Sequence, residues 1–411
     1  MLARAKEQVA AFMDPILSIN DISNIIVSIC RSAVQEQTAI PLHEAEKDSS
    51  CSVTHVLQYS GVIPQQIAAY ITTMFQCTGL ATTLSGEDSI MSWAQAVFDA
   101  WLPHSSTITF ITSGSTGEPT HQKLETVLLW QEAEELAQAL LQKRKRIVAT
   151  VPCHHLYGFL FTVLLPKVSA LPCVAPLPFP SRAFVNGLHL GDFVVSFPLF
   201  WEGLLKQEIV FPDDVHGSTS TAPCPPATMH SLLASGLARL TNIYGSSETG
   251  GLGYQHHPEA PLTLFAFWRR VHLDDPDESW IERIHPSGTS QQPVAMPDHV
   301  EWFSSRCFSV RGRKDKIVQV GGLNVSLSRT VECMRSHPDI LDCAVRLMRP
   351  EEGNRLKAFV IPKTSEVDMQ ALRSDLYSWC RSQLRPAERP KKITFGSRFP
   401  VTSMGKNKDW N

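Results

Sequence analysis

Short apolar strands alternate with helices from residue 107 onward, and this alternation limits the possible folds more than any other pattern in the chain. Strand-like runs occur in TITFITSG (107–114), RIVATVP (146–152) and DFVVSFP (192–198). The segment 125–146 predicts a helix, because its acidic residues come early and its basic residues late, as the helix dipole favours. Since strands that alternate with helices usually pair in parallel, the sequence predicts an α/β domain with mixed, largely parallel sheets.

A second, smaller domain is indicated near residues 311–316, where the pattern changes to a charged stretch followed by a hairpin-like run. The predicted elements beyond it are a helix at 327–336, strands near 340–348 and 356–362, a helix at 368–384 and a strand near 393–396. These elements suit an α+β domain of about 100 residues, an ordinary domain size. We therefore expect domains at 1–313 and 314–411.

The composition is that of a globular protein. At 411 residues the chain is long for a single core, and 43% hydrophobic with 19% charged residues argues against disorder. A net charge of −3 gives no indication of a nucleic-acid partner. The ten Cys are scattered without a CxxC pair, which disfavours a disulfide framework and a Cys-rich zinc site. Unpaired thiols fit a reducing compartment, so we expect a cytoplasmic protein.

The most apolar region, residues 156–180, contains Lys167 and five prolines. These interruptions leave no stretch long enough for a spanning helix, so we expect a buried helix and strand joined by proline-rich turns. The first 17 residues also lack the apolar core and cleavage site of a secretory signal. The sequence therefore predicts no membrane span.

The loop after the first strand, residues 112–117, combines two Gly with Ser and Thr. Glycine lacks the Cβ that keeps backbone N–H groups away from an anion, and the hydroxyls add donors. The loop departs from the GxxxxGK[ST] phosphate-binding pattern, and a Ser- and Gly-rich loop alone is more often a turn. It is therefore a candidate anion site or an ordinary turn.

Three further segments carry chemically useful side chains. In NIYGSSETGG (242–251), Tyr244 could stack on a flat base and Glu248 could bind a divalent cation, although a plain turn with a surface carboxylate has the same pattern. Arg313 and Asp315 could form a surface ion pair, the usual role of such charges. Lys406 follows a glycine near the C-terminus, where a lysine ordinarily serves solubility. None of these segments identifies a function alone.

The order and spacing of seven segments resemble the adenylate-forming superfamily, which comprises acyl-CoA synthetases, nonribosomal adenylation domains and luciferases. The matching segments are TSGSTGEP (112–119), VPCHHLYG (151–158), STAPCP (220–225), YGSSE (244–248), Asp298 with Arg313 15 positions later, GRKDKIVQVGGLNVS (312–326) and PVTSMGK (400–406). They follow the family's order over about three quarters of the chain. Residues 1–105 contribute nothing to the resemblance and look like a divergent, shortened subdomain.

The resemblance implies a two-step reaction. Family members join a carboxylic acid to AMP with release of pyrophosphate, and then pass the acyl group to a thiol. The chain is thus expected to be an ATP- and Mg²⁺-dependent ligase for an aryl, enoyl or fatty acid, with CoA or the phosphopantetheine of an acyl carrier protein as acceptor. The alternative is a non-catalytic or adenylation-only protein that binds an acyl-adenylate.

The resemblance also assigns roles at the nucleotide. The residues that match the phosphate-cradling loop are Thr112, Ser113, Gly114, Ser115, Thr116 and Gly117. Tyr244 matches the residue that stacks on adenine. Asp298 matches the residue that accepts hydrogen bonds from the ribose hydroxyls, and Arg313 supports the same end. Glu248 and Thr116 match ligands of Mg²⁺.

Further matches concern catalysis and the second step. Lys406 matches the residue that bridges the carboxylate and the α-phosphate, and His155 matches the family His, as a pocket wall, a gate or a satisfied interior His. Asp315 matches the hinge about which a mobile small domain rotates and withdraws Lys406. Gly321 and Gly322 match the loop past which a pantetheine arm reaches the acyl-adenylate, and two glycines permit that close approach.

Two departures from the family bear on function. Thr120 stands where the family loop usually carries Lys or Arg, so either Lys123 supplies the charge from a shifted position or the site is weakened. The short N-terminal part resembles small ligases that prime acyl carrier proteins, which favours a carrier protein over free CoA. The residues expected around the acid are His155, Tyr157, Phe159, Ser196, Phe197 and Gly251. Such an aromatic lining suits a flat aryl or enoyl acid, although Phe is also common in a core.

Overall fold

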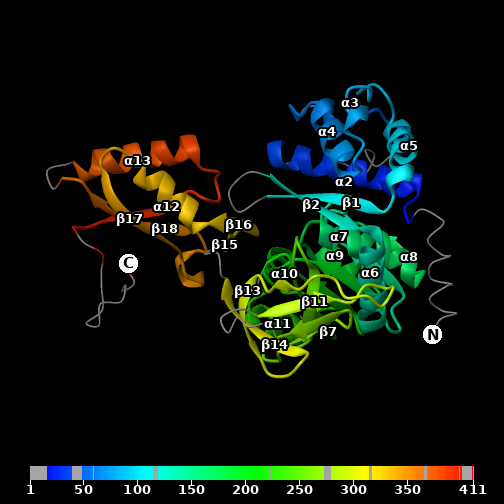
Figure 1. The fold of residues 1–411 in the computed structure, drawn as a ribbon. Helices are drawn as coiled ribbons and strands as arrows, with labels where there is room; N and C mark the ends of the chain where they lie inside the picture. Colours follow the sequence, from blue (N-terminus) through cyan, green and yellow to red (C-terminus); the bar gives the residue numbers. More distant parts are fainter. Residues whose placement is uncertain are drawn as a thin grey trace. The chain divides into compact units, whose positions relative to one another are not determined.

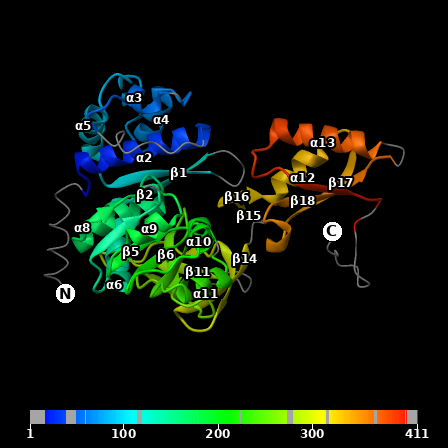
Figure 2. The ribbon, with the colours of Figure 1, turned by 180° about the vertical axis from the view of Figure 1, so that it is seen from behind.

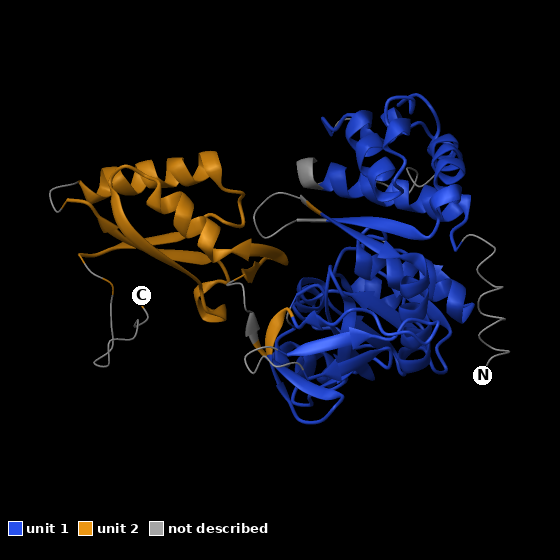
Figure 3. Cartoon of the chain, in the orientation of Figure 1, with its two compact units in different colours: residues 1–112, 121–296, 300–310 blue, residues 113–120, 297–299, 311–411 orange. Residues whose placement is uncertain are grey.

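The structure is a computed structural model, and it describes residues 16–38, 49–58, 60–113, 119–176, 178–222, 224–272, 279–313, 317–364, 368–397, 399 and 410, without the side chains of 36–38, 112, 113, 119, 312 and 313. The chain forms two compact units (Figure 3). Unit 1 comprises residues 1–112, 121–296 and 300–310, and unit 2 comprises residues 113–120, 297–299 and 311–411.

Helices form the N-terminal part of unit 1: α2 (Ile19–Thr38), α3 (Val53–Leu57), α4 (Pro64–Met74) and α5 (Ile90–Trp101). Figures 1 and 2 show them gathered beside the hairpin of β1 (Thr107–Ser113) and β2 (Pro119–Glu125). In α2, Ile22, Ile25, Ile26 and Ile29 recur at helical spacing and are buried together with Trp93 of α5. The part of the sequence with the weakest pattern is therefore a folded helical cluster.

A nine-stranded sheet has the strand order β13-β14-β9-β8-β7-β6-β5-β3-β4. Its strands are β3 (Arg146–Ala149), β4 (Cys173–Val174), β5 (Asp192–Ser196), β6 (His216–Thr219), β7 (Arg239–Ser246), β8 (Gly250–Gln255), β9 (Leu262–Leu264), β13 (Asp298–Trp302) and β14 (Cys307–Arg313). The strands from β4 to β7 pair in parallel, and β7, β8, β9 and β14 pair antiparallel. A separate antiparallel sheet contains β10 (Trp268–Val271), β11 (Trp280–Arg283) and β12 (Val294–Ala295). The predicted mixed, largely parallel α/β architecture is confirmed.

Both faces of the parallel strands are buried. In β5, Phe193 and Val195 belong to one core cluster and Val194 to another, because alternate side chains point to opposite faces. The first cluster also holds residues of α2, α5 and α6 (Thr126–Leu140). The second holds residues of α9 (Arg182–Asn186), α10 (Pro198–Leu205) and α11 (Pro226–Ala234). Helices therefore cover each face of the parallel strands.

The helix predicted at 125–146 ends earlier, because α6 stops at Leu140. Lys143 adopts a left-handed conformation with φ 62°, which turns the chain toward β3. The buried Arg144 then binds both carboxylate oxygens of Asp214 at 2.9 Å. This tertiary ion pair outweighs the helical preference of the basic residues that follow Leu140.

The apolar region 156–180 contains α7 (Leu156–Phe159), a π-helical turn (Leu160–Leu164), α8 (Leu165–Ser169) and β4. The predicted helix and strand are thus present, but β4 is not buried as expected, because Val174 is exposed. Among the described helices, none combines the length and apolar character needed to cross a bilayer. All ten cysteines lie in the described part of the chain and are free thiols, which agrees with the sequence prediction.

Unit 2 contains an antiparallel hairpin of β15 (Ile317–Val320) and β16 (Leu323–Ser326), followed by an α+β fold. Its other elements are α12 (Leu327–Arg335), β17 (Ile340–Leu347), β18 (Leu356–Pro362), α13 (Met369–Gln383) and β19 (Lys392–Phe395). The strand order is β17-β18-β19, antiparallel then parallel. The predicted helices and strands of this region are confirmed to within one or two residues.

Candidate active site

Glu248 lies on an exposed turn between β7 and β8. The flanking residues Ser246 and Gly250 are paired across the two strands. Within the turn, the N–H of Thr249 donates to Ser246 Oγ at 3.3 Å, and the two hydroxyl groups lie 3.0 Å apart. The side chain of Glu248 is exposed. A carboxylate is thus presented to solvent on a turn whose base is tied by the sheet.

Glycine is required at the base of this turn. A Cβ on Gly245 would lie 2.3 Å from the carbonyl oxygen of Gly250, and Gly250 itself has a φ of +74°. The ladder also shifts register between Tyr244 and Gly245. Tyr244 is half-buried, and its ring meets Phe308 of β14 edge to face at 5.8 Å. The backbone geometry of the turn therefore requires the glycines of YGSSETGG whether or not a ligand binds.

His155 is the N-cap residue of α7 and is exposed, whereas the neighbouring His154 is buried. The two rings lie 4.2 Å apart. Burial lowers the pKa of His154 well below its usual range, and the adjacent His155 adds to this effect. Gly158 is required here because a Cβ would lie 1.9 Å from the carbonyl oxygen of Pro152. The predicted residue, His155, is thus the more exposed of the two, although the surrounding protein still lowers its pKa by desolvation.

Helix α2 holds the segment that carries these histidines. Ser28 Oγ accepts the N–H of Cys153 at 3.1 Å and lies 2.9 Å from Nδ1 of His154. Asp21 forms an ion pair with Lys167 of α8 at 2.8 Å. Residues before 105, to which the sequence assigned no function, therefore support the expected acid-binding segment.

The phosphate-loop residues Gly114, Ser115, Thr116 and Gly117 lie outside the described residues, as do the side chains of Thr112 and Ser113. β1 and β2 form the two-stranded sheet that flanks this loop. Lys123 is exposed and lies four residues after the start of β2, about 13 Å along an extended strand. Thr120, where the family usually carries the loop cation, also lies on β2, so the charge of Lys123 stands about 10 Å further along the strand.

Asp298 starts β13 and is buried, with 4% of its surface exposed. Arg313 ends β14, the next strand in the sheet, although its side chain is not described. The N–H of Phe303 donates to the carbonyl of Cys307 at 2.8 Å, which closes a tight turn between the strands. Strands joined in this way run antiparallel, so Asp298 and Arg313 lie at the same end of the hairpin. The spacing of 15 positions thus has a structural basis.

Gly321 and Gly322 form the two-residue turn between β15 and β16, where Val320 pairs with Leu323. Their φ values of +59° and +82° are those of a type I′ hairpin turn, which favours glycine at both positions. A Cβ at either position would meet nothing within 4 Å, so the requirement is conformational and not steric. The hinge residue Asp315 lies outside the described residues.

Lys406 also lies outside the described residues, but the chain is described on both sides of it at Phe399 and Trp410. Both of these rings contact Phe359 of β18, at centroid distances of 5.9 and 5.8 Å. The carbonyl of Trp410 also accepts a hydrogen bond from the buried ammonium of Lys357. Phe399 and Trp410, which flank the segment that carries Lys406, therefore both pack against the ring of Phe359 in unit 2.

The expected lining of the acid pocket is partly core. Phe159 is fully buried and packs edge to face on Phe110 at 5.3 Å, so it cannot face an open cavity. Ser196 is also fully buried and accepts a hydrogen bond from Thr150. Tyr157 donates to or accepts from Ser218 at 2.8 Å, and burial raises its pKa. The side chains of these three residues are therefore held by contacts within the protein.

Two polar residues near these segments were missed by the sequence reasoning. Ser28 gave no signal, because a serine on a helix is ordinary. Glu132 did give one: it falls in the apolar stripe of α6 between Leu129 and Leu136, where a charge needs a partner. Its carboxylate accepts the backbone N–H of Gly251 at 2.8 Å.

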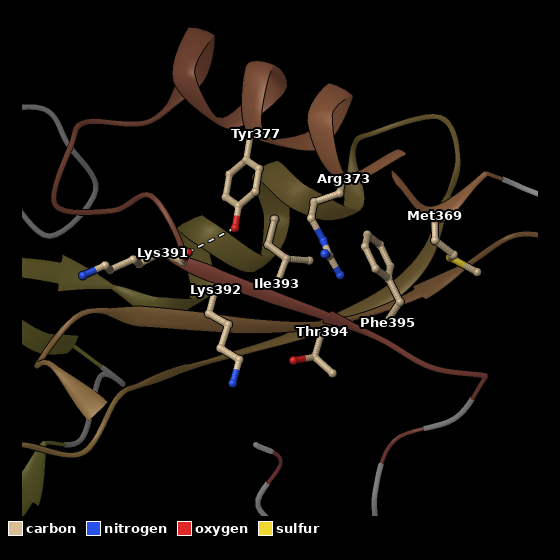
Figure 4. Close-up of a pocket in the computed structure, with 8 residues that line it drawn as sticks. All are labelled: Met369, Arg373, Tyr377, Lys391, Lys392, Ile393, Thr394 and Phe395. Carbon is tan, nitrogen blue, oxygen red and sulfur yellow. Dashed lines mark hydrogen bonds between the residues drawn. The ribbon is translucent and has the colours of Figure 1, made fainter. Parts of the chain in front are cut away.

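A shallow groove of about 500 Å³ lies between α13 and β19 in unit 2 (Figure 4). Arg373 lies over the ring of Phe395 at 5.4 Å, and Tyr377 donates to the carbonyl of Lys391 at 3.1 Å. None of the predicted site residues lines this groove.

A magnesium ion would suit the turn at Glu248. Mg²⁺ is usually held by one or two carboxylates together with substrate phosphates and water. Within the described ranges, no three His, Cys, Asp or Glu side chains converge as a metal site. A single exposed carboxylate, as at Glu248, is sufficient where nucleotide phosphates and water supply the other ligands of Mg²⁺.

Comparison with known proteins identifies the family. Residues 332–406 match the family described as AMP-binding enzyme C-terminal domain. A 4-coumarate–CoA ligase of Halorhodospira halophila is 35% identical over 329 residues, which cover 80% of this chain and 82% of that protein. Its counterpart in Rhodobacter capsulatus is 33% identical over 345 residues, with coverage of 81% and 84%.

Solved structures share the fold. The o-succinylbenzoate CoA synthetase of Bacillus subtilis has a TM-score of 0.57 at 16% identity, covering 73% of this chain and 67% of that one. The amide bond synthetase of Marinactinospora thermotolerans has a TM-score of 0.58 at 15% identity, covering 93% and 92%. The chain therefore belongs to the adenylate-forming superfamily as an AMP-forming ligase, which uses ATP to join a small carboxylic acid to CoA through an acyl-adenylate.

Proposed function

We propose that the acid is a flat, unsaturated aryl acid of the 4-coumarate type. The observation that carries this proposal is the identity of 31–35% with three bacterial 4-coumarate–CoA ligases. The half-buried ring of Phe197, one of the residues expected around the acid, supports it. A flat acid gains more from such rings than a flexible fatty acid does.

The first step must overcome charge, because a carboxylate attacks the α-phosphate of an anionic nucleotide. Preorganised positive charge and donors lower such a barrier. We assign the bridging cation to Lys406 and the metal ligand to Glu248, assisted by Thr116 of the loop at 112–117. Mg²⁺, when bound, neutralises phosphate charge.

The nucleoside would be held by three other residues. Tyr244 stacks on adenine, and its half-buried ring is already fixed by Phe308. Asp298 accepts hydrogen bonds from the ribose hydroxyls, and Arg313 supports the same end. Both lie at one end of the β13–β14 hairpin, which is consistent with a shared ligand.

The second step transfers the acyl group to a thiol. We assign the hinge to Asp315 and the passage of the pantetheine arm to the turn at Gly321 and Gly322. Both glycines are exposed and neither has a side chain, so a slender thiol arm would be able to pass close to the backbone of this turn. CoA and the phosphopantetheine of a carrier protein share this arm, and the identity with CoA ligases supports CoA over the carrier protein that the sequence analysis favoured.

Pyrophosphate–ATP exchange with purified protein and Mg²⁺ tests the proposal. The panel contains 4-coumarate, cinnamate, benzoate, an enoic acid and a medium-chain fatty acid, followed by thioester assays with CoA and with a loaded carrier protein. We expect exchange that depends on 4-coumarate-like acids and thioester formation with CoA.

Exchange with fatty acids alone would contradict the acid class, and transfer to the carrier alone would contradict the acceptor. ATP binding without exchange would support a non-catalytic protein, and thiol-independent turnover an adenylation-only one.

A further inference from the structure

A carboxylate is buried beside the turn that carries Glu248. Glu132 is 2% exposed and lies on the apolar face of α6. That face also contains Leu128, Leu129, Ala133, Leu136 and Leu140. Oε1 of Glu132 accepts the N–H of Gly251 at 2.8 Å, and Oε2 has no hydrogen-bond partner among the described residues.

The nearest cation is Arg283 of β11, which is also buried. Its Nη1 lies 4.0 Å from Oε2 of Glu132, while its Nη2 donates to the carbonyl of Leu128 at 2.7 Å. Its guanidinium group lies over the ring of Phe267 at 4.3 Å. Burial lowers the pKa of Arg283 and raises that of Glu132 to about 7, which shows that desolvation outweighs the pairing for both groups.

A buried ion pair at this distance adds little to the stability of the fold. Removing two charges from water costs more than a long ion pair returns, and apolar residues of the same size usually replace buried pairs without loss. The arrangement around Glu132 therefore points to a role in positioning the backbone that it contacts.

The contacted peptide is fixed from two sides. The N–H of Gly251 donates to Glu132, and its carbonyl accepts the indole N–H of Trp268 at 2.8 Å. A Cβ on Gly250 would lie 2.6 Å from Oε2 of Glu132, and one on Gly251 would lie 2.6 Å from Oε1. The carboxylate therefore lies flat against two residues that must lack side chains.

These two glycines form the return side of the turn. Gly250 pairs with Ser246 and Gly251 with Gly245, immediately after the register shift in the ladder. The three turn residues that include Glu248 lie between the paired positions. A shift of the Gly250–Gly251 backbone would therefore move Glu248.

We propose that Glu132 is a positioning residue, whose carboxylate fixes the Gly250–Gly251 backbone and thereby places Glu248 for binding of the nucleotide-bound Mg²⁺. This inference rests on the proposed role of Glu248. It adds a residue outside the matching segments, on a helix to which the sequence analysis assigned no site residue.

The test measures the Kd of MgATP by calorimetry with the full chain. Glu132→Leu removes the acceptor for Gly251 and keeps the volume, so we expect MgATP binding to weaken about 10-fold or more, as misplacement of a binding group does. Glu132→Gln keeps an acceptor oxygen and should stay within about 3-fold of wild type. Glu135→Leu is the matched control, because Glu135 lies on the same helix and accepts the N–H of Ala266, away from the turn. It should leave the Kd unchanged.

A double-mutant cycle with Glu248→Gln separates positioning from a merely structural role. If Glu132 acts through Glu248, Glu132→Leu has little further effect once Glu248 is replaced. A full additional loss in the double variant, or wild-type binding by Glu132→Leu, would overturn the inference. If Glu248→Gln itself leaves the Kd unchanged while Tyr244→Ala weakens binding, the proposed metal role of Glu248 fails instead.

Trp268→Phe provides a variant that does not depend on folding of Glu132→Leu. It removes the indole donor from the carbonyl of Gly251 and keeps the aromatic ring. We expect a smaller loss of MgATP affinity, which should also disappear in the Glu248→Gln background. Additive losses here would contradict the inference in the same way.

Discussion

Ser28 Oγ lies 2.9 Å from Nδ1 of His154, although 126 residues separate the two along the chain. The serine hydroxyl also accepts the N–H of Cys153, so it can donate its own proton to a neutral imidazole. The lowered pKa of His154 is consistent with that neutral form. The helical cluster at the N-terminus is thus joined by hydrogen bonds to the segment that presents His155.

Ser28→Ala should destabilise this connection. It leaves the buried Nδ1 of His154 and the N–H of Cys153 without their partner, which typically costs about 1–3 kcal/mol. We expect a lower free energy of unfolding in urea and a higher KM for the acid, with a smaller change in the KM for ATP. Ser92→Ala on the exposed face of α5 is the control and should match wild type. An unchanged KM for the acid would show that the connection does not reach the substrate.

Lys123→Ala tests whether this lysine replaces the cation that Thr120 lacks. If it does, the KM for ATP should rise about 10-fold, as expected for one lost charge-assisted contact to phosphate. The KM for the acid should stay unchanged. Lys143→Ala, an exposed lysine beyond α6, is the control. Unchanged ATP dependence would place the compensating charge elsewhere.

Lys406→Ala should abolish adenylation while sparing thioester formation from supplied acyl-adenylate. Loss of a transition-state cation costs about 100- to 1000-fold in the step that uses it. Lys408→Ala is the neighbouring control. The two half-reactions can be followed by pyrophosphate exchange and by release of AMP. Equal loss in both would contradict the model of two conformations that use different residues.

Much of the fold follows from local pattern, and the exceptions have identifiable causes. The elements from residue 327 onward were predicted to within one or two residues, since each has a clear helical or alternating pattern. In contrast, α2 has apolar residues at helical spacing, but its many Ile residues also favour strands. The helix at 125–146 was predicted too long because the ion pair between Arg144 and Asp214 is invisible locally.

The site was predictable where a motif fixes chemistry and not where packing does. One short segment predicted Glu248 as a metal ligand, and the structure places this residue on an exposed turn, although its role stays a prediction. The motif did not show that Phe159 and Ser196 are core residues, because burial depends on elements far along the chain. Glu132 could have been found from a charge within an apolar stripe, but its partner Gly251 lies 119 residues away.

The pH dependence of stability should report on Glu132. Its pKa is raised by burial from 4.5 to about 7, so the folded state binds a proton more tightly than the unfolded state does. This stabilisation is full below about pH 4.5 and is lost as the pH rises through about 7, a change of about 3 kcal/mol. The free energy of unfolding of wild type minus that of Glu132→Gln should therefore fall over this range. A difference that is constant from pH 5 to 8 would contradict a raised pKa, and Glu135→Gln should follow wild type.

Trp410→Ala should impair adenylation selectively. Trp410 and Phe399 both contact Phe359, and Arg346 lies over the Trp410 ring at 5.5 Å. These contacts hold the two ends of the segment that carries Lys406. Releasing one end of a segment of about ten residues returns roughly 2 kcal/mol of closure entropy, so we expect adenylation to fall by about 30-fold.

Transfer from supplied acyl-adenylate should then remain within about 2-fold of wild type, because that step does not use Lys406. Trp410→Phe keeps a ring against Phe359 and should recover most of the activity. Trp379→Ala, which removes another half-buried indole of unit 2, is the control for general destabilisation. Because a destabilised domain would lose both half-reactions together, a parallel loss in Trp410→Ala would show that Trp410 only stabilises the fold. A selective loss would show that the contacts of Trp410 control where Lys406 is placed for adenylation.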